Sequence, residues 1–349
     1  MDGLLDEWMI GFEFKENLKE PSCTQKLKKA FCIFYRCYFV LMSLIPNHPS
    51  IQSSNHPWDG SEKKGKNMNK ETLTGMIAPM VVPFDRAGDL DEAAFRHEAR
   101  YLIDHGIDGI SSGGSTGEGA LLSDAELGRC LEIIGEENDR KLPVYAGIIR
   151  NSTREVARAG LDAKARGADV LLVTPVFYHG ATDEGNFEFY REIGEAVRLP
   201  IIIYNVVASN LITPTFFERL TGLEWVIGIK QVDPVRLAEI AALCHGRHLV
   251  YAACDQMLYG TYVSGACGAF SAMVTIAPEL CRRQWRAFKR GDQKTAMEIQ
   301  KHMVPIVMTY LQSPYPGKVK ALLNLQGRTG GLPRKPILPV EGELLERMR

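Results

Sequence analysis

Residues 201–230 read IIIYNVVASNLITPTFFERLTGLEWVIGIK. The stretch begins with an apolar run, Ile201–Tyr204, and ends with a second one, Val226–Lys230, with a helical pattern between them. Neither run alternates with polar residues, which is typical of parallel strands covered on both faces. Thr213 and Pro214 place an N-cap oxygen before a proline at the first helical position. The stretch therefore predicts a strand–helix–strand unit.

Runs of the same kind recur along the chain. They begin about 20–35 residues apart, the size of one strand–helix unit. Eight alternating units favour an α/β fold of the closed (β/α)8 or TIM barrel type, and an open doubly wound sheet is the alternative. The eight runs are Met76–Val82, Gly109–Ser112, Val144–Ile148, Val170–Thr174, Ile201–Tyr204, Val226–Lys230, Leu249–Ala252 and Ala269–Ala272.

Short polar signals mark the ends of the intervening helices. Ser123 and Ser152 are each followed three residues later by a glutamate, which predicts capping boxes. Gly106 and Gly167 stand just before the next strand, where a left-handed helix end is favoured. These signals support the helices that the barrel requires.

Composition and apolar pattern divide the chain into three parts. Residues 1–67 include the apolar segment Ala30–Pro46, which contains Arg36 and is shorter than the roughly 20 apolar residues of a membrane-spanning helix. We expect 1–67 to be a disordered or dispensable extension, with a signal-like or anchoring segment as the alternative. We expect residues 68–290 to form the catalytic barrel and 291–349 a C-terminal helical extension. Helical patterns in the last part cover Lys294–Tyr310, Lys318–Gln326 and Glu341–Met348.

Composition narrows the classes of partner. The chain has 349 residues, a formal net charge of −1 and 45% hydrophobic residues. With so little net charge, no overall field favours nucleic acid or a membrane surface. The eight cysteines include no C-x-x-C pair, which argues against zinc ribbons and thioredoxin-like redox motifs and fits a cytoplasmic location. We expect a small-molecule substrate.

Two polar side chains end neighbouring strands, where barrels of this type build their active sites. Lys230 ends the run VIGIK, and Tyr204 ends the run IIIY. A desolvated lysine loses its proton more readily, and a neutral amine can attack a carbonyl to form an imine. A phenol one strand away can move protons to and from the intermediate. The structural alternatives are a lysine that reaches solvent and a packed core tyrosine.

The loop after the second run reads GGSTGEG, from Gly113 to Gly119. Its glycines, Gly114 among them, allow successive amides to converge on an anion, and Ser115 and Thr116 add hydroxyl donors suited to a carboxylate. A tight turn without a ligand is the alternative. The loop contains G-x-S-x-G, but the helix cap that follows is Ser123 rather than Ser115, so a serine hydrolase is disfavoured.

These sites together resemble the family of dihydrodipicolinate synthase and N-acetylneuraminate lyase, the pyruvate-dependent class I aldolases. The resemblance covers about residues 75–339. The matching segments are IAPMVVPFD at 77–85, GGSTGEG at 113–119, VTP at 173–175, YNV at 204–206, GIKQ at 228–231 and GKVKALLNLQG at 317–327.

The resemblance assigns roles to these residues. Lys230 is similar to the Schiff-base lysine and Tyr204 to the proton-transferring tyrosine. Ser115 and Thr116 resemble the hydroxyl pair that binds the pyruvyl carboxylate and relays the proton. Phe270 occupies the place of an apolar residue whose backbone contacts the substrate. The resemblance also implies a homotetramer, a dimer of tight dimers, with no metal and no organic cofactor.

Two positions depart from the synthases that the chain resembles. Phe177 stands where the synthases carry a second tyrosine, which they lend to the neighbouring subunit, although Tyr178 is adjacent. Ser209 stands where the synthases carry an arginine that binds the carboxylate of aspartate semialdehyde. A neutral hydroxyl does not replace a guanidinium, so we expect Ser209 to face a different substrate.

The function expected from the sequence is that of a lyase or aldolase that forms a Schiff base with a 2-oxo acid. A hydroxylated 2-oxo acid or sugar-acid derivative is the favoured substrate. The alternatives are 4-hydroxy-tetrahydrodipicolinate synthase, which condenses pyruvate with aspartate semialdehyde, a 2-keto-3-deoxy acid dehydratase, and a non-catalytic binding protein on the same barrel. Fold alone does not separate them.

Overall fold

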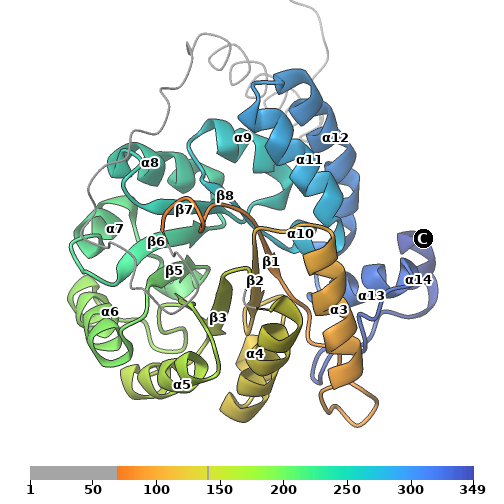
Figure 1. Ribbon diagram of the computed structural model, residues 1–349, viewed down its shortest axis with the longest axis horizontal. Coiled ribbons are helices and arrows are strands. Elements are labelled where there is room, and N and C mark those ends of the chain that lie inside the picture. The colour runs from red at the N-terminus through yellow and green to blue at the C-terminus, as the bar shows by residue number, and fades with distance from the viewer. Residues whose placement is uncertain (1–68, 140) are drawn as a thin grey trace, which may run out of the picture. The chain divides into compact units, whose positions relative to one another are not determined.

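The computed structural model describes residues 69–139 and 141–349. Eight parallel strands form a barrel in chain order, which closes because β1 pairs with β8. Helices surround the ring of strands (Figure 1). The predicted TIM barrel is confirmed. The strands are β1 (Gly75–Pro79), β2 (Gly109–Ser112), β3 (Val144–Ile148), β4 (Val170–Val173), β5 (Ile201–Asn205), β6 (Val226–Gln231), β7 (Leu249–Ala252) and β8 (Gly268–Phe270).

The helices that follow the strands pack on the outside of the barrel (Figure 1). Short 3-10 turns interrupt three of the loops. The helices are α3 (Glu92–Asp104), α4 (Asp124–Asn138), α5 (Thr153–Ala165), α6 (Asp183–Val197), α7 (Pro214–Leu220), α8 (Pro234–Cys244), α9 (Leu258–Val263), α10 (Ala272–Ile276), α11 (Pro278–Lys289), α12 (Gln293–Tyr310), α13 (Gly317–Leu325) and α14 (Gly342–Met348), and the 3-10 turns are η1 (Gly119–Leu121), η2 (Ala208–Asn210) and η3 (Asp255–Met257).

The predicted capping signals are present, one of them in full. Ser123 accepts from the Glu126 amide at 3.2 Å, and Glu126 accepts from the Ser123 amide at 2.9 Å, which completes a capping box. Ser152 Oγ also accepts from the Glu155 amide, at 3.3 Å. The Glu155 carboxylate, however, accepts from the Ser152 hydroxyl and not from the Ser152 amide. The second box is therefore only half formed.

The first and last strands end earlier than their apolar runs predicted. After Pro79, carbonyl groups are taken by side chains instead of a neighbouring strand. Thr275 donates to the Pro79 carbonyl at 2.8 Å, and Lys320 donates to the Val82 carbonyl at 2.6 Å. At the other strand, the Ser271 hydroxyl accepts from an amide of α10 at 3.0 Å and so begins that helix. Side-chain bonding therefore ends both strands.

Alternate residues of the strands face two separate cores. One core lies between strands and helices, and the other fills the inside of the barrel. Tyr204 and Phe270 belong to the inner core, together with Tyr145 and Tyr251. The inner core thus carries aromatic rings close to the strand end where Lys230 lies.

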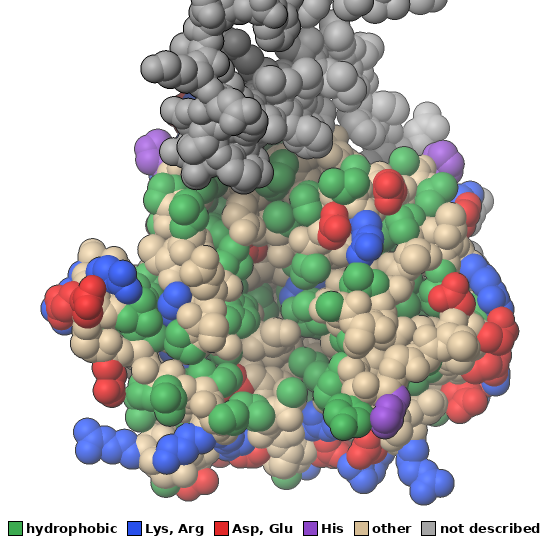
Figure 2. All heavy atoms as spheres, turned by 180° about the vertical axis from the view of Figure 1, so that it is seen from behind, with side chains coloured by type: hydrophobic (Ala, Val, Ile, Leu, Met, Phe, Trp, Pro, Cys, Tyr) green, Lys and Arg blue, Asp and Glu red, His purple; other side chains and the backbone are tan. Residues whose placement is uncertain are grey.

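Residues 291–349 contain α12, α13 and α14, as their helical patterns predicted. The expectations for residues 1–67, including the apolar segment Ala30–Pro46, lie outside the described residues. No helix in the described ranges is long and apolar enough to cross a membrane. On the face drawn in Figure 2, acidic and basic side chains are interspersed, and hydrophobic side chains lie around a central hollow.

Candidate active site

Lys230 lies one residue before the end of β6 and is 4% exposed. Its Nζ atom lies 4.1 Å from the centre of the Tyr204 ring and 4.5 Å from the centre of the Phe270 ring. Tyr204 is the register partner of Lys230 on β5, so neighbouring strands place the two side chains together. Ring faces attract a cation without taking up its hydrogen-bond donors. The structure therefore holds a lysine inside the barrel mouth between two predicted site residues.

Tyr204 connects the lysine to the glycine-rich loop after β2. Its hydroxyl donates to Ser115 Oγ at 3.1 Å. Tyr204 is buried, and Ser115 is partly exposed. The predicted set Lys230, Tyr204, Ser115 and Phe270 thus comes together, with the phenol hydroxyl placed between the amine and the loop.

The GGSTGEG loop folds back on itself. The amides of Gly117 and Gly119 both donate to the Gly114 carbonyl, at 3.1 and 3.0 Å, and the Glu118 amide donates to the Ser115 carbonyl at 3.1 Å. These three amides close the turn. In the described part of the chain, no protein acceptor takes the amides of Ser115 and Thr116. The loop amides left without a protein acceptor in these ranges therefore include those of Ser115 and Thr116.

Gly114 borders open space in the loop, because a side chain added there would meet no atom within 4 Å. Gly119 is the opposite case, because an added Cβ would overlap the backbone of Gly113. The loop therefore needs glycine at position 119 for packing. At position 114 glycine leaves room beside the hydroxyl pair.

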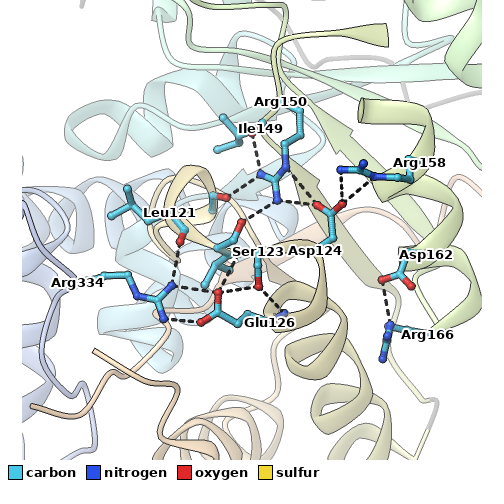
Figure 3. A network of polar contacts seen from close by, with 12 residues as sticks. Leu121, Ser123, Asp124, Glu126, Ile149, Arg150, Arg158, Asp162, Arg166 and Arg334 are labelled. Carbon is cyan, nitrogen blue, oxygen red and sulfur yellow. Dashed lines mark hydrogen bonds and ion pairs between the residues drawn. The ribbon is translucent and has the colours of Figure 1, made fainter. Parts of the chain in front are cut away.

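Two arginines clamp the turn that follows the loop (Figure 3). Arg150 donates to the carbonyls of Gly119 at 3.2 Å and Leu122 at 2.8 Å, and to Asp124 at 2.9 Å. Arg334 donates to the Leu121 carbonyl at 2.9 Å and to Glu126 at 2.5 and 3.1 Å. The Arg334 guanidinium holds the pKa of Glu126 at about 2, well below its usual range. The clamp fixes the loop before any ligand arrives.

A buried ion pair holds the loop from a third side. Glu118 pairs with Lys320 of α13, whose ammonium also donates to the carbonyls of Val82 at 2.6 Å and Leu332 at 2.7 Å. Both side chains are almost fully buried, 1% exposed for Lys320 and 0% for Glu118. Burial lowers the pKa of Lys320 to about 8, although Glu118 opposes the shift. This pair joins residues 291–349 to the active-site loop.

The structure adds Tyr315, which the sequence reasoning did not select. Its hydroxyl and Thr116 Oγ1 form a hydrogen bond of 2.8 Å, across 199 residues of sequence. Thr116 is 3% exposed, and Tyr315 is partly buried between α12 and α13. Burial is the main reason why the pKa of the Tyr315 phenol lies far above its usual range. The local signal was a tyrosine between two prolines, SPYPG, directly before the matching segment GKVKALLNLQG.

A second pair that sequence reasoning missed lies behind Lys230. The Tyr310 hydroxyl donates to Asp255 Oδ2 at 2.5 Å, and Asp255 is 4% exposed in η3 after β7. Burial raises the pKa of Asp255, while hydrogen bonds and the charge of Lys230 act in the other direction. Asp255 therefore lies close enough to Lys230 for the two groups to interact electrostatically.

The two departing positions lie in the outer loops. Phe177 is 39% exposed and Tyr178 is 78% exposed, and Asn151 accepts from both amides. Ser209 is exposed and donates to the Phe177 carbonyl at 3.2 Å. Within the described residues, no hydrogen bond joins Ser209 to the Lys230 cluster. The structure thus does not bring Ser209 together with the other predicted site residues.

Potential metal ligands and thiols both occur in the described ranges. No group of three or more His, Cys, Asp or Glu side chains there could hold a metal ion. Burial raises the pKa of Cys267 and of Cys130 to about 12, which disfavours the reactive thiolate.

The comparisons with known proteins agree with this geometry. The model of the dihydrodipicolinate synthetase family matches residues 72–349. The chain is 31% identical to the 4-hydroxy-tetrahydrodipicolinate synthase of Bartonella tribocorum over 273 residues, 77% of this chain and 93% of that protein. A dihydrodipicolinate synthase from Bacillus anthracis is 28% identical with a TM-score of 0.75, over 79% of this chain and 96% of that one.

A further similar structure is CdNal from Clostridium difficile in complex with mannosamine. It is 25% identical with a TM-score of 0.74 and covers 79% of this chain and 97% of its own. The resemblance seen in the sequence is thereby confirmed, and so is an enzymatic role. This chain belongs to the dihydrodipicolinate synthetase family and is a carbon–carbon lyase of the class I aldolase type.

Proposed function

We propose that Lys230 forms a Schiff base with a 2-oxo acid and that the enzyme cleaves a hydroxylated 2-oxo acid to release pyruvate. The observation that carries the proposal is the position of Lys230 Nζ. It is buried between the rings of Tyr204 and Phe270, and the Tyr204 hydroxyl lies on the loop that presents Ser115 and Thr116. An amine, a proton carrier and a carboxylate site thus lie together.

Lys320 is the competing amine, because burial lowers its pKa to about 8. Its ammonium, however, is occupied by Glu118 and by two backbone carbonyls. Lys230 forms no ion pair with a described residue, and its neighbours are ring faces. A nucleophile needs a free lone pair that can reach a substrate. Among the described residues, the Lys230 amine has no hydrogen-bond acceptor to leave before it reaches a substrate, whereas Lys320 would have to leave Glu118 and two carbonyls.

The chemistry begins when Lys230 Nζ attacks C2 of the 2-oxo acid. The C=O electrons move to oxygen, and a proton passes from nitrogen to that oxygen to give a carbinolamine. Tyr204 then protonates the hydroxyl, the C–O bond breaks and water leaves, while the nitrogen lone pair forms the C=N bond.

The protonated imine then accepts the electrons of the C3–C4 bond. The C4 hydroxyl gives its proton to the Tyr204 phenolate, so an aldehyde leaves and an enamine remains. Tyr204 gives that proton to C3, and water then adds at C2 and loses a proton to the Tyr204 phenolate. The resulting carbinolamine passes its hydroxyl proton to nitrogen, and the C–N bond breaks to release pyruvate and restore the amine. Run in the opposite direction, the same steps condense pyruvate with an aldehyde.

Ser115 and Thr116 are proposed to bind the carboxylate next to C2. Their amides are free of protein acceptors within the described residues, and their side chains add two hydroxyl groups. Hydrogen bonds from donors fixed by the surrounding structure suit a carboxylate that must keep one orientation through several steps. Gly114 leaves space on the same side of the loop.

The substrate proposal rests on charge in the outer loops, where Ser209 contacts the Phe177 carbonyl. Ser209 is neutral, and Arg150, which could have supplied a cation, is engaged by Asp124 and by backbone carbonyls (Figure 3). A polyhydroxylated tail needs no cation. The synthase reaction is the second candidate, because the curated relatives that are 29–31% identical carry that name.

A homotetramer without metal or organic cofactor completes the proposal. Its support is the family resemblance. A smaller assembly is the alternative, because one dihydrodipicolinate synthase variant of similar structure, 26% identical with a TM-score of 0.75, is described as monomeric. Light scattering on the purified protein distinguishes a tetramer from a smaller assembly.

Trapping with borohydride tests the Schiff base. Pyruvate and borohydride should add a reduced pyruvyl group to Lys230, identified by peptide mapping, and Lys230→Ala should lose it. Lys318→Arg, a change at another buried lysine, is the matched control and should keep the adduct. Absence of an adduct, or an adduct on Lys318 or Lys320, would contradict the mechanism.

A further inference from the structure

Tyr315 contacts the active-site loop, and the proposed chemistry has not used it. It lies in the segment between α12 and α13, and its hydroxyl is 2.8 Å from Thr116 Oγ1. Thr116 directly follows Ser115, which accepts from Tyr204. Two phenols therefore contact two consecutive hydroxyl residues of one loop.

We propose that Tyr315 is a positioning residue of the active site, which donates to Thr116 and so directs the Thr116 proton toward the substrate. The inference rests on the proposed imine chemistry. It also holds that Tyr315 serves the site of its own subunit, since the hydrogen bond lies within one chain.

The proposal gives the hydrogen bond between Tyr315 and Thr116 a direction. Burial raises the pKa of the Tyr315 phenol and so keeps it protonated, and negative charge on the neighbouring Tyr204 or Asp255 side chain would raise the pKa further. A neutral phenol can donate to a hydroxyl oxygen, and the proposal assigns the donor role in this 2.8 Å contact to Tyr315. Because Thr116 Oγ1 then accepts from Tyr315, its own hydrogen is free to point away, toward the carboxylate site.

The segment that carries Tyr315 is fixed to the same loop at a second place. Five residues beyond Tyr315, Lys320 makes the buried ion pair with Glu118, two residues beyond Thr116. Tyr315 also packs against the core between strands and helices. Core packing and the nearby ion pair fix the Tyr315 side chain before the substrate binds. Little conformational entropy is then lost in the reaction, as a positioning group requires.

The side chain at position 177 explains why Thr116 would need a hydroxyl from elsewhere in the chain. Phe177 has no hydroxyl, and the phenol beside it, Tyr178, is 78% exposed in the outer loop. Among the described residues, Tyr315 is the phenol whose hydroxyl reaches Thr116. The hydroxyl that orders Thr116 thus comes from the C-terminal part of the chain.

Exchange of the pyruvate methyl hydrogens for solvent deuterium provides a test that needs no knowledge of the second substrate. The exchange requires imine and enamine formation only. Tyr315→Phe should lower kcat for exchange by roughly 10- to 100-fold, as expected for a displaced active-site group. KM for pyruvate should stay within about twofold, because the free amides that bind the carboxylate remain. Tyr178→Phe is the matched control and should exchange at the wild-type rate.

A double-mutant cycle separates positioning from general structural damage. If Tyr315 acts through Thr116, the double variant Thr116→Val/Tyr315→Phe should be no slower than Thr116→Val alone. Full addition of the two single effects would overturn the inference, and so would a wild-type exchange rate in Tyr315→Phe.

Mixed subunits test which site Tyr315 serves. Lys230→Ala and Tyr315→Phe chains, produced together, should not regain exchange activity if each tyrosine serves its own lysine. Regained activity would show that the tyrosine is lent to a partner and would overturn this part of the inference.

The adduct and exchange experiments distinguish an error in the role of Tyr315 from an error in the proposed function. If wild-type protein gives no Lys230 adduct with pyruvate and borohydride and no exchange, the imine function is wrong. If wild type gives both and Tyr315→Phe matches it, the function stands and only the role of Tyr315 is wrong.

Discussion

Tyr204 and Ser115 are 89 residues apart in the sequence, yet the Tyr204 hydroxyl donates to Ser115 Oγ at 3.1 Å. The same Tyr204 ring covers Lys230 Nζ at 4.1 Å. One side chain therefore contacts the amine with its face and the carboxylate loop with its hydroxyl. These two contacts can be separated by mutation, because phenylalanine keeps the ring and loses the hydroxyl.

Tyr204→Phe should lower kcat by roughly 10² to 10⁴, the usual effect of losing a positioned acid–base group. Binding of pyruvate should change much less, because the loop amides and the ring face remain. Rates of deuterium exchange into pyruvate measure both quantities, with the exposed Tyr178→Phe as control. Unchanged turnover would mean that Tyr204 is only a packed core residue.

Gly119→Ala should destabilise the protein, because the new Cβ would overlap the Gly113 carbonyl inside the active-site loop. Forcing an extra methyl group into packed structure costs roughly 1–3 kcal/mol. Gly114→Ala is the matched change in the same loop, where a Cβ meets no atom within 4 Å. Thermal unfolding should therefore show a lower Tm for the first variant and not for the second. Equal Tm values would show that the loop backbone shifts freely.

The barrel could be predicted from sequence because its signal is local. Each strand is a short apolar run, and Lys230 and Tyr204 end two neighbouring runs, so chain order alone placed them side by side. The loop glycines between 113 and 119 were equally visible. Because these signals are local, the sequence could place Tyr204, Lys230 and the glycine-rich loop at the same end of the barrel.

The rest of the site depends on contacts that no local pattern records. Tyr315 reaches Thr116 across 199 residues, and Tyr310 reaches Asp255 across 55. Both tyrosines lie in or beside α12, in the part of the chain that the sequence indicated only as helical. The number of free loop amides also depended on how the turn closed, which residue types alone do not determine.

Acid should weaken the clamp between Glu126 and Arg334. The folded pKa of Glu126 is about 2, against an ordinary value of 4.5, with hydrogen bonding from Arg334 as the largest cause. Because the unfolded chain binds this proton more readily, the pair stabilises the fold above about pH 4.5, and its contribution is lost as the pH falls toward 2. The stability difference between wild type and Glu126→Gln should therefore be constant near neutral pH and shrink on acidification.

Denaturant unfolding at a series of pH values measures this difference. Glu343→Gln, at an exposed glutamate of α14, is the control for a simple loss of one negative charge. If the difference for Glu126→Gln stays the same down to pH 2, the ion pair does not contribute to the stability of the fold.

The substrate preference should reflect the absence of an arginine at position 209. A charge-assisted bond to a carboxylate contributes roughly 1.5–3 kcal/mol, so its absence at Ser209 should weaken capture of aspartate semialdehyde by about ten- to a hundredfold. A neutral, hydroxylated aldehyde loses nothing by this change. We therefore expect cleavage of a neutral-tailed hydroxy-2-oxo acid to have a higher kcat/KM than condensation of pyruvate with aspartate semialdehyde.

Steady-state rates for both reactions on one preparation decide this prediction. Ser209→Arg tests its cause, since a guanidinium at this position should raise kcat/KM for aspartate semialdehyde and leave the neutral substrate little changed. Ser209→Gln, a long but neutral side chain, controls for size. A higher kcat/KM for aspartate semialdehyde in the wild-type enzyme would restore the synthase function, and another cation would then have to bind the carboxylate. Arg150 could do so only by leaving Asp124 and the loop carbonyls that it now holds.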